Sequence, residues 1–255
     1  MKKTKVVLAM VCAVLLVAAS VMGTLAYLTS KATVTNSFTV GNVTLGNTNE
    51  AGLDEALVNQ DGQPIKSKTD STVVSKTDAP RVTENSYKLQ PGHKYTKDPT
   101  IHVGDNSDNC YLFVKVENGI VNIEATEDDT SGYKKIATQM AEKGWKALGA
   151  GYDNIWVYVG TETGASTPKS VSKSADVSVF DEFKIAGTTS SDTMKSYENS
   201  KIVVTAYGVQ VDGFSGKTAT QIWDAAFAAT ETPVTPAPGG DTPAGGDDTP
   251  VDPAE

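Results

Sequence analysis

The stretch from Thr33 to Leu45 alternates between apolar and polar side chains. Val34, Phe38 and Val40 fall on one face, and threonine and serine residues fall on the other, until Gly41-Asn42 interrupts the register. This alternation predicts a half-buried strand over residues 33–45 with a bulge near its end.

Further apolar runs predict more strands. Residues 109–125 are typical of a hairpin, because a long apolar strand is followed by a break at Asn118-Gly119 and a second strand. Residues 154–160 and 201–213 are rich in β-branched and aromatic side chains, whereas 133–148 and 218–229 have helical spacing. Short strands separated by Gly, Asn, Asp and Ser predict a mainly β protein, an antiparallel Ig-like β-sandwich with short helical insertions.

The two ends of the chain differ from this middle region. MKKTK is followed by an apolar run from Val6 to about Met22, which is typical of an export signal, with a retained membrane anchor as the alternative. Small residues follow, and we expect cleavage between Ala26 and Tyr27, so that the protein meets the membrane only during export. Residues 27–229 would then form the β-sandwich domain. Residues 230–255, rich in Pro, Gly, Thr and Asp, predict a disordered acidic tail.

The net charge limits the choice of partners. The formal charge is −9, and removal of residues 1–26 with their three lysines would make it −12. No Lys or Arg cluster is visible, so neither nucleic acid nor an anionic membrane is expected as a partner. Only Cys110 would remain after cleavage, which excludes an intramolecular disulfide in the mature chain.

Catalytic patterns are scarce. His93 and His102 are the only histidines, and no H-E-x-x-H motif is present, so we expect no catalytic residues, no metal site and no cofactor. Two acidic clusters leave a calcium site open: Asp105 with Asp108, and Glu127 with Asp128 and Asp129. Neither has EF-hand spacing, so both are interpreted as solvated turns.

Three separated stretches carry a family resemblance. GTLAYLTSKATVTNSFTVGNVTL follows the apolar run, LQPGHKYTKDP lies in the middle, and VVTAYGVQVDGF with QIWDAAF lies near the end. Together they cover about a quarter of the chain and resemble the TasA/camelysin family of exported Gram-positive proteins. This resemblance implies a jelly-roll-like sandwich and a signal peptidase of the SipW type as a processing partner.

The resemblance also assigns a role to the middle stretch. Pro91-Gly92 predicts a tight turn that reverses the chain between residues 85–89 and a strand near Pro99. Thr96 and Asp98 would cap the start of that second strand. The role of this motif is expected to be structural.

The resemblance implies a secreted structural protein of the cell surface or biofilm matrix. Such subunits form fibres by donating an N-terminal strand, here residues 33–45, to a second copy. Val34, Phe38 and Val40 would be buried in the neighbour, which makes the chain its own main partner. Two alternatives remain: a monomeric surface-binding module, and a camelysin-type metalloendopeptidase.

Overall fold

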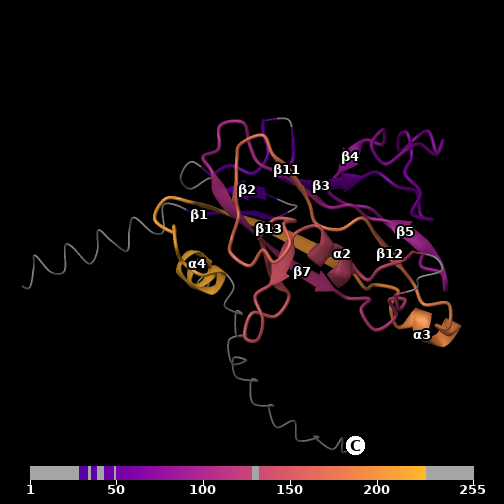
Figure 1. The fold of residues 1–255 in the computed structure, drawn as a ribbon. Coiled ribbons are helices and arrows are strands. Elements are labelled where there is room, and N and C mark those ends of the chain that lie inside the picture. The colour runs from indigo at the N-terminus through magenta and orange to yellow at the C-terminus, as the bar shows by residue number, and fades with distance from the viewer. Residues whose placement is uncertain (1–28, 34–35, 39–42, 49, 128–131, 228–255) are drawn as a thin grey trace, which may run out of the picture.

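The computed structural model describes residues 29–33, 36–38, 43–48, 50–127 and 132–227. Its largest sheet has seven strands, and the order along its main path is β2-β1-β13-β7-β9-β8. The bounds are β1 (Thr29–Thr33), β2 (Asn36–Phe38), β13 (Ile202–Gln210), β7 (Cys110–Asn118), β9 (Ile155–Tyr158) and β8 (Trp145–Ala147). β10 (Ser170–Val171) also pairs with β7, and all these pairings are antiparallel. Figure 1 shows β7 and β13 running together through the middle of the molecule.

Two smaller antiparallel sheets complete the architecture. The first has the order β11-β6-β3-β4, with bounds β11 (Asp176–Ser178), β6 (Thr100–His102), β3 (Leu53–Ala56) and β4 (Arg81–Val82). The second pairs β12 (Glu182–Lys184) with β5 (Lys94–Thr96). Within the described ranges, three short helices are inserted: α2 (Ile136–Glu142), α3 (Ser191–Lys195) and α4 (Ala219–Ala226). The chain is therefore mainly β, and the predicted antiparallel sandwich with helical insertions is confirmed.

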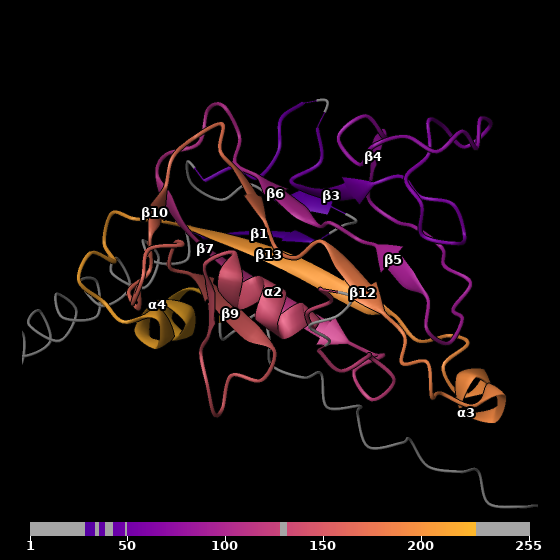
Figure 2. The same cartoon turned by 45° about the vertical axis from the view of Figure 1, so that its right-hand side comes forward.

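The side chains of β7 and β13 point alternately to the two faces of the large sheet, and each face packs against a core cluster. Leu112 and Val114 of β7 belong to a core shared with Leu53, Ile101 and other residues of the small sheets. Their neighbours in β7 and β13 face the opposite way and pack against the apolar side of α4. This second cluster includes Tyr111, Phe113, Tyr207, Val209, Ile222, Trp223 and Phe227. Figures 1 and 2 show α4 on the side of β7 and β13 away from β3 and β6.

The N-terminal strand prediction differs from the structure. β1 and β2 form an antiparallel hairpin in which Thr33 pairs with Asn36, so the described residues do not form one strand over 33–45. In the sequence, Thr33 and Asn36 are separated by Val-Thr, which lacks the glycine or asparagine signal of a tight hairpin. Leu45 forms an isolated bridge with Val103, apart from the hairpin.

The predicted second strand after Asn118 is also wrong. Residues 119–122 form turns, and the backbone N–H of Ile123 donates to Ile120 O at 2.9 Å. Ile120 and Ile123 are buried while Val121 is exposed. That spacing of three fits a turn rather than a strand, and β7 pairs with β13 instead.

The predicted helices lie where expected but are shorter. The helix predicted over 133–148 ends at Glu142, and β8 begins at Trp145 after Gly144, a residue type that commonly ends helices. α4 has a capping box, in which Thr218 Oγ1 accepts from Gln221 N and Gln221 Oε1 accepts from Thr218 N. Among the described residues, no helix has the length and apolar character needed to cross a membrane.

Candidate functional site: the N-terminal hairpin, a groove and a buried charge network

The N-terminal hairpin is one candidate for a functional element. β1 pairs with β13 from Thr29↔Val209 to Ala32↔Ala206, and β2 lies beyond it at the end of the strand order. Of the predicted assembly residues, Phe38 is the last residue of β2, with Lys31 as its Cα partner. Val34, Val40, the expected cleavage site at Ala26 and Tyr27, and the tail after Phe227 lie outside the described residues.

A groove follows along the same strand. β13 lines it with Ile202, Val203 and Val204, which precede the positions paired with β1. Within the described part of the chain, no strand pairs with this end of β13 on the side opposite β7. The groove has a volume of about 580 Å³, and its apolar wall consists of Leu53, Tyr87, Leu89, Pro99, Ile120 and Phe183. It is large enough for an extended segment or a small ligand.

The predicted turn is present at Pro91-Gly92. His93 N donates to Gln90 O at 3.1 Å, and Gly92 has φ 77°, a value that glycine adopts at little cost. The turn leads directly into β5, and the preceding residues 85–89 form no strand. The hydroxyl of Tyr95 in β5 donates to Lys88 O at 2.8 Å and accepts from Gln90 N at 2.6 Å. The ring of Tyr95 therefore holds the turn from inside the core.

The predicted caps have other roles. Thr96 O accepts a hydrogen bond from Tyr87 Oη at 3.1 Å. Asp98 is buried, and its Oδ1 accepts from Ala56 N at 2.7 Å, which ties β3 to the start of β6. The carboxylate is thus part of a network that joins three strands, rather than a local strand cap.

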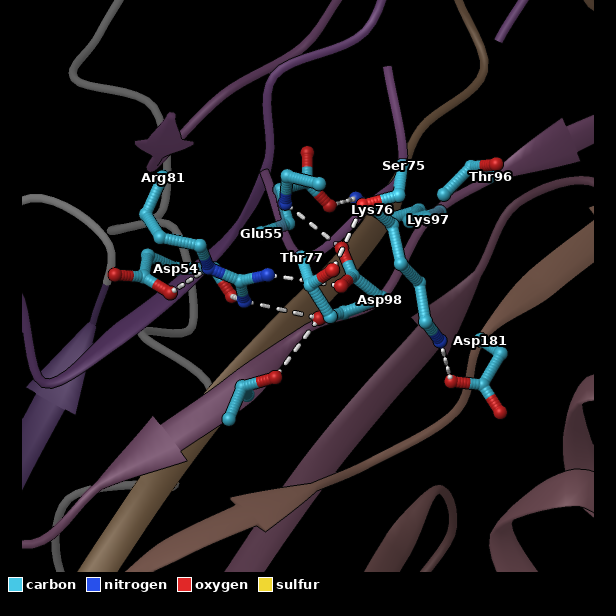
Figure 3. A network of polar contacts seen from close by, with 12 residues as sticks. Asp54, Glu55, Ser75, Lys76, Thr77, Arg81, Thr96, Lys97, Asp98 and Asp181 are labelled. Carbon is cyan, nitrogen blue, oxygen red and sulfur yellow. Dashed lines mark hydrogen bonds and ion pairs between the residues drawn. The ribbon is translucent and has the colours of Figure 1, made fainter. Parts of the chain in front are cut away.

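Arg81 is the centre of this network. Its Nε donates to Asp54 Oδ1 at 2.7 Å, and its Nη1 donates to Asp98 Oδ2 at 2.8 Å. Nη2 also donates to the main-chain oxygens of Asp54 and Asp98. Figure 3 shows Arg81 between these two carboxylates, with Lys76 reaching Asp181 nearby. The planar guanidinium suits such multiple contacts, which a lysine could not make.

His102 extends the network on the other side of Asp54. Its Nε2 lies 2.9 Å from Asp54 Oδ1, and its Nδ1 lies 2.7 Å from Asp176 Oδ1. Each ring nitrogen faces a carboxylate oxygen, so both carry a proton and the ring is cationic. The hydrogen bond with Asp54 is the main cause that raises the pKa of His102 to about 9. Burial would raise the pKa of Asp54, but hydrogen bonds from His102 and Arg81 outweigh it and lower that pKa.

The two histidines have different surroundings. His93 Nε2 lies 3.0 Å from Asp61 O, and its ring packs edge-on against Tyr95. His102 is bound to carboxylates. No group of three or more His, Cys, Asp or Glu side chains within the described ranges is arranged to hold a metal ion.

The two acidic clusters considered for calcium make contacts within the protein. Asp105 Oδ1 accepts from Ser174 Oγ at 2.7 Å, and Asp108 O accepts from Ser107 Oγ at 2.9 Å. Glu127 accepts from Thr138, and Asp128 and Asp129 lie outside the described residues.

Cys110 is fully buried at the start of β7. Burial raises the pKa of its thiol to about 12, so the reactive thiolate is disfavoured. This fits the residue as a small apolar side chain of the core.

Sequence reasoning did not identify Arg81 and Asp54 as members of this network. One signal was present, because Arg81 is the only arginine in a chain that otherwise uses lysine. A single arginine in such a chain suggests a position that needs a planar group with several donors.

Comparisons of the chain with protein-family models, with curated proteins and with solved structures gave no match.

Proposed function

We propose that the chain is a secreted structural protein of the TasA/camelysin type. In this proposal, copies of the chain assemble into fibres of the cell surface or extracellular matrix. Each copy donates its N-terminal segment to the next, and a SipW-type peptidase first removes the signal. The proposal rests on the three sequence stretches quoted above and, above all, on the position of the N-terminal hairpin.

The pairing of β1 with β13 is the observation that carries this proposal. β1 is the first strand of the described chain, and its pairing with β13 involves four Cα partners, compared with nine between β13 and β7. If β1 left, β13 would keep its long pairing with β7, and the cores on both faces of β7 would keep their β13 side chains. The same backbone groups of β13 could then pair with a strand from a second copy. Exchange in one direction does not close on itself and builds a filament.

The groove provides further support. It begins where the pairing between β1 and β13 ends, so a donated strand longer than β1 could continue along Ile202–Val204. The apolar wall beside these residues could take side chains such as Phe38 or Val40. A donor segment of residues 27–42 is long enough for both parts of this surface, at about 3.3 Å per residue.

The test compares filament yield of the secreted chain, by electron microscopy and sedimentation, with that of three variants. Deletion of residues 27–40 and the substitution Phe38→Asp should both lower the yield strongly, since the second places a charge in the shared surface. Val73→Asp is the matched control, because Val73 is exposed on a distant loop and should leave assembly unchanged. A synthetic peptide of residues 27–42 should block growth of the unmodified chain. Equal filament yield from the deletion variant would refute strand donation.

The groove also favours the second candidate, a monomeric surface-binding module. In that case, purified chain would remain monomeric at high concentration. Substitution of Leu89 or Phe183 in the groove would then reduce retention on cell-wall material, while Phe38→Asp would not.

A further inference from the structure

One buried carboxylate holds both a lysine amine and an asparagine amide. Glu55 Oε2 accepts from Lys97 Nζ at 2.6 Å, and Glu55 Oε1 accepts from Asn85 Nδ2 at 2.9 Å. The side chain of Glu55 is 6% exposed and that of Lys97 is 12% exposed. The three residues come from β3, from the segment after β4 and from the residues after β5, so the fold itself brings them together.

The amide of Asn85 is held in one orientation. Its Oδ1 accepts from Val58 N at 3.0 Å, and its Nδ2 also donates to Ala56 O at 2.9 Å. The N–H of Val58 therefore points at the oxygen that would become negative if a nucleophile attacked Cγ. On the other side, Lys97 is fixed by its backbone N–H, which donates to Asp181 O at 3.0 Å. Main-chain groups thus hold the amide of Asn85, and Glu55 holds the amine of Lys97.

Aromatic side chains border the three groups on one side of the groove. Tyr87 lies beside them and packs edge-on against Tyr95 and Phe183. Burial is the main cause that raises the pKa of Tyr87, and the negative charges of Glu55 and Asp98 add to it. Lys97 Nζ and Glu55 Oε2 are 2.6 Å apart, so a proton can pass directly from the amine to the carboxylate during the reaction. A neutral, buried lysine amine is a nucleophile.

We propose that Lys97 and Asn85 join through an intramolecular isopeptide bond, with Glu55 as the proton carrier. Lys97 Nζ attacks Asn85 Cγ, and the negative charge on Oδ1 is stabilised by the N–H of Val58. Glu55 gives its proton to Nδ2, the Cγ–Nδ2 bond breaks, and Glu55 takes a proton from the new amide nitrogen. Ammonia leaves and takes up the proton that remains on Glu55, which regenerates the carboxylate, so no oxidant or other reactant is needed.

The structure provides an exit for the ammonia. Glu55, Asn85 and Lys97 all line the groove described above, so the leaving group has a path to solvent. Lys143 is bound to a carboxylate in a different way. It lies 2.7 Å from Asp181, and no asparagine amide is bound to that carboxylate in the described structure. Lys143 therefore serves as a matched control.

Peptide mapping of the secreted chain tests the proposal. Trypsin should release residues 82–88 and residues 95–115 as one branched peptide, since a modified Lys97 is no longer cleaved. Its mass should be lower than the sum of the two linear peptides by about 17 Da, the mass of ammonia. Fragmentation should place the branch between Asn85 and Lys97.

Three variants separate the chemistry from simple packing. Lys97→Arg and Glu55→Gln should each lose the branched peptide, whereas Lys143→Arg should keep it in full. The result for the unmodified chain does not depend on whether a variant folds. Complete recovery of residues 82–88 and 95–97 as separate peptides from the folded, unmodified chain would overturn the proposal. So would a branched peptide that persists in Lys97→Arg. Because the mapping needs no filaments, its outcome is independent of the fibre proposal.

Discussion

Raising the pH should destabilise the protein through one residue, His102. Its pKa rises from 6.5 to about 9 on folding, chiefly because of the hydrogen bond with Asp54. A raised folded-state pKa gives stability that is fully present below pH 6.5 and is lost as the pH rises through 9. The carboxylates of Asp176 and Glu50 also face the ring, at 2.7 and 3.6 Å from Nδ1, and favour the same cationic form. Arg81 is the nearby cation, and it is held by Asp54 and Asp98.

The size of the effect follows from the shift in pKa. Each unit corresponds to about 1.4 kcal/mol, so the full contribution of His102 is about 3 kcal/mol. At pH 7 most of this contribution remains, and near pH 10 almost none does. The side chains of His102 and Asp54 are 11% and 6% exposed, but that of Asp176 is 68% exposed, so solvent screens the Asp176 contact and lowers this value.

Urea unfolding across this pH range measures the effect. Lysines and tyrosines also titrate at high pH, so the comparison is between the unmodified chain and His102→Gln, which keeps a polar side chain but cannot take up a proton. The variant should be less stable by about 2–3 kcal/mol near pH 7, and the difference should almost vanish near pH 10. A constant difference over the whole range would refute the cationic assignment of His102.

Three further outcomes follow from the packing. Gly208→Val should lower the free energy of unfolding by about 1–3 kcal/mol, because an added Cβ would lie 2.8 Å from Val43 Cγ1; thermal unfolding measures this, and an unchanged midpoint would contradict the close packing. Asp98→Ala should cost about 3–5 kcal/mol, since it leaves Arg81 short of a carboxylate and a buried backbone N–H of β3 without its acceptor. Urea titration would show this, and a loss no larger than that of an exposed ion pair would count against the network. Cys110 should not react with a thiol reagent in the native protein and should react fully after denaturation; rapid labelling of the folded chain would show that β7 opens easily.

The sequence was most informative where one physical signal dominated. β7, β9 and β13 were predicted because their apolar runs are long and rich in β-branched and aromatic residues. α4 was predicted from its apolar spacing, and its start at Thr218 is fixed by a local capping box. The strand does end at Asn118 as predicted, but no hairpin partner follows it directly in the sequence. A local pattern does not reveal that β7 pairs with a strand some ninety residues further on.

The buried network shows why the candidate site was harder to predict. The four residues of β3, Leu53–Ala56, are all buried although two of them are acidic. Alternation places Asp54 and Glu55 on opposite faces of a strand, so at least one should be exposed. Partners distant in sequence bury both, because Arg81 covers one side and Lys97 covers the other. Asp98 stood out as part of the turn motif, but its long-range contacts with Ala56 and Arg81 required the structure.

The central position of β13 has a consequence for the order of folding. This strand completes the large sheet, yet it comes near the end of the described chain, and its partners β1 and β7 come much earlier in the sequence. Folding that depends on such distant pairings has a high contact order and is slow. A polypeptide emerging from the ribosome or through a membrane could not close its main sheet until residue 210 had appeared. If the chain is exported as proposed, its main sheet cannot close before residue 210 has crossed the membrane.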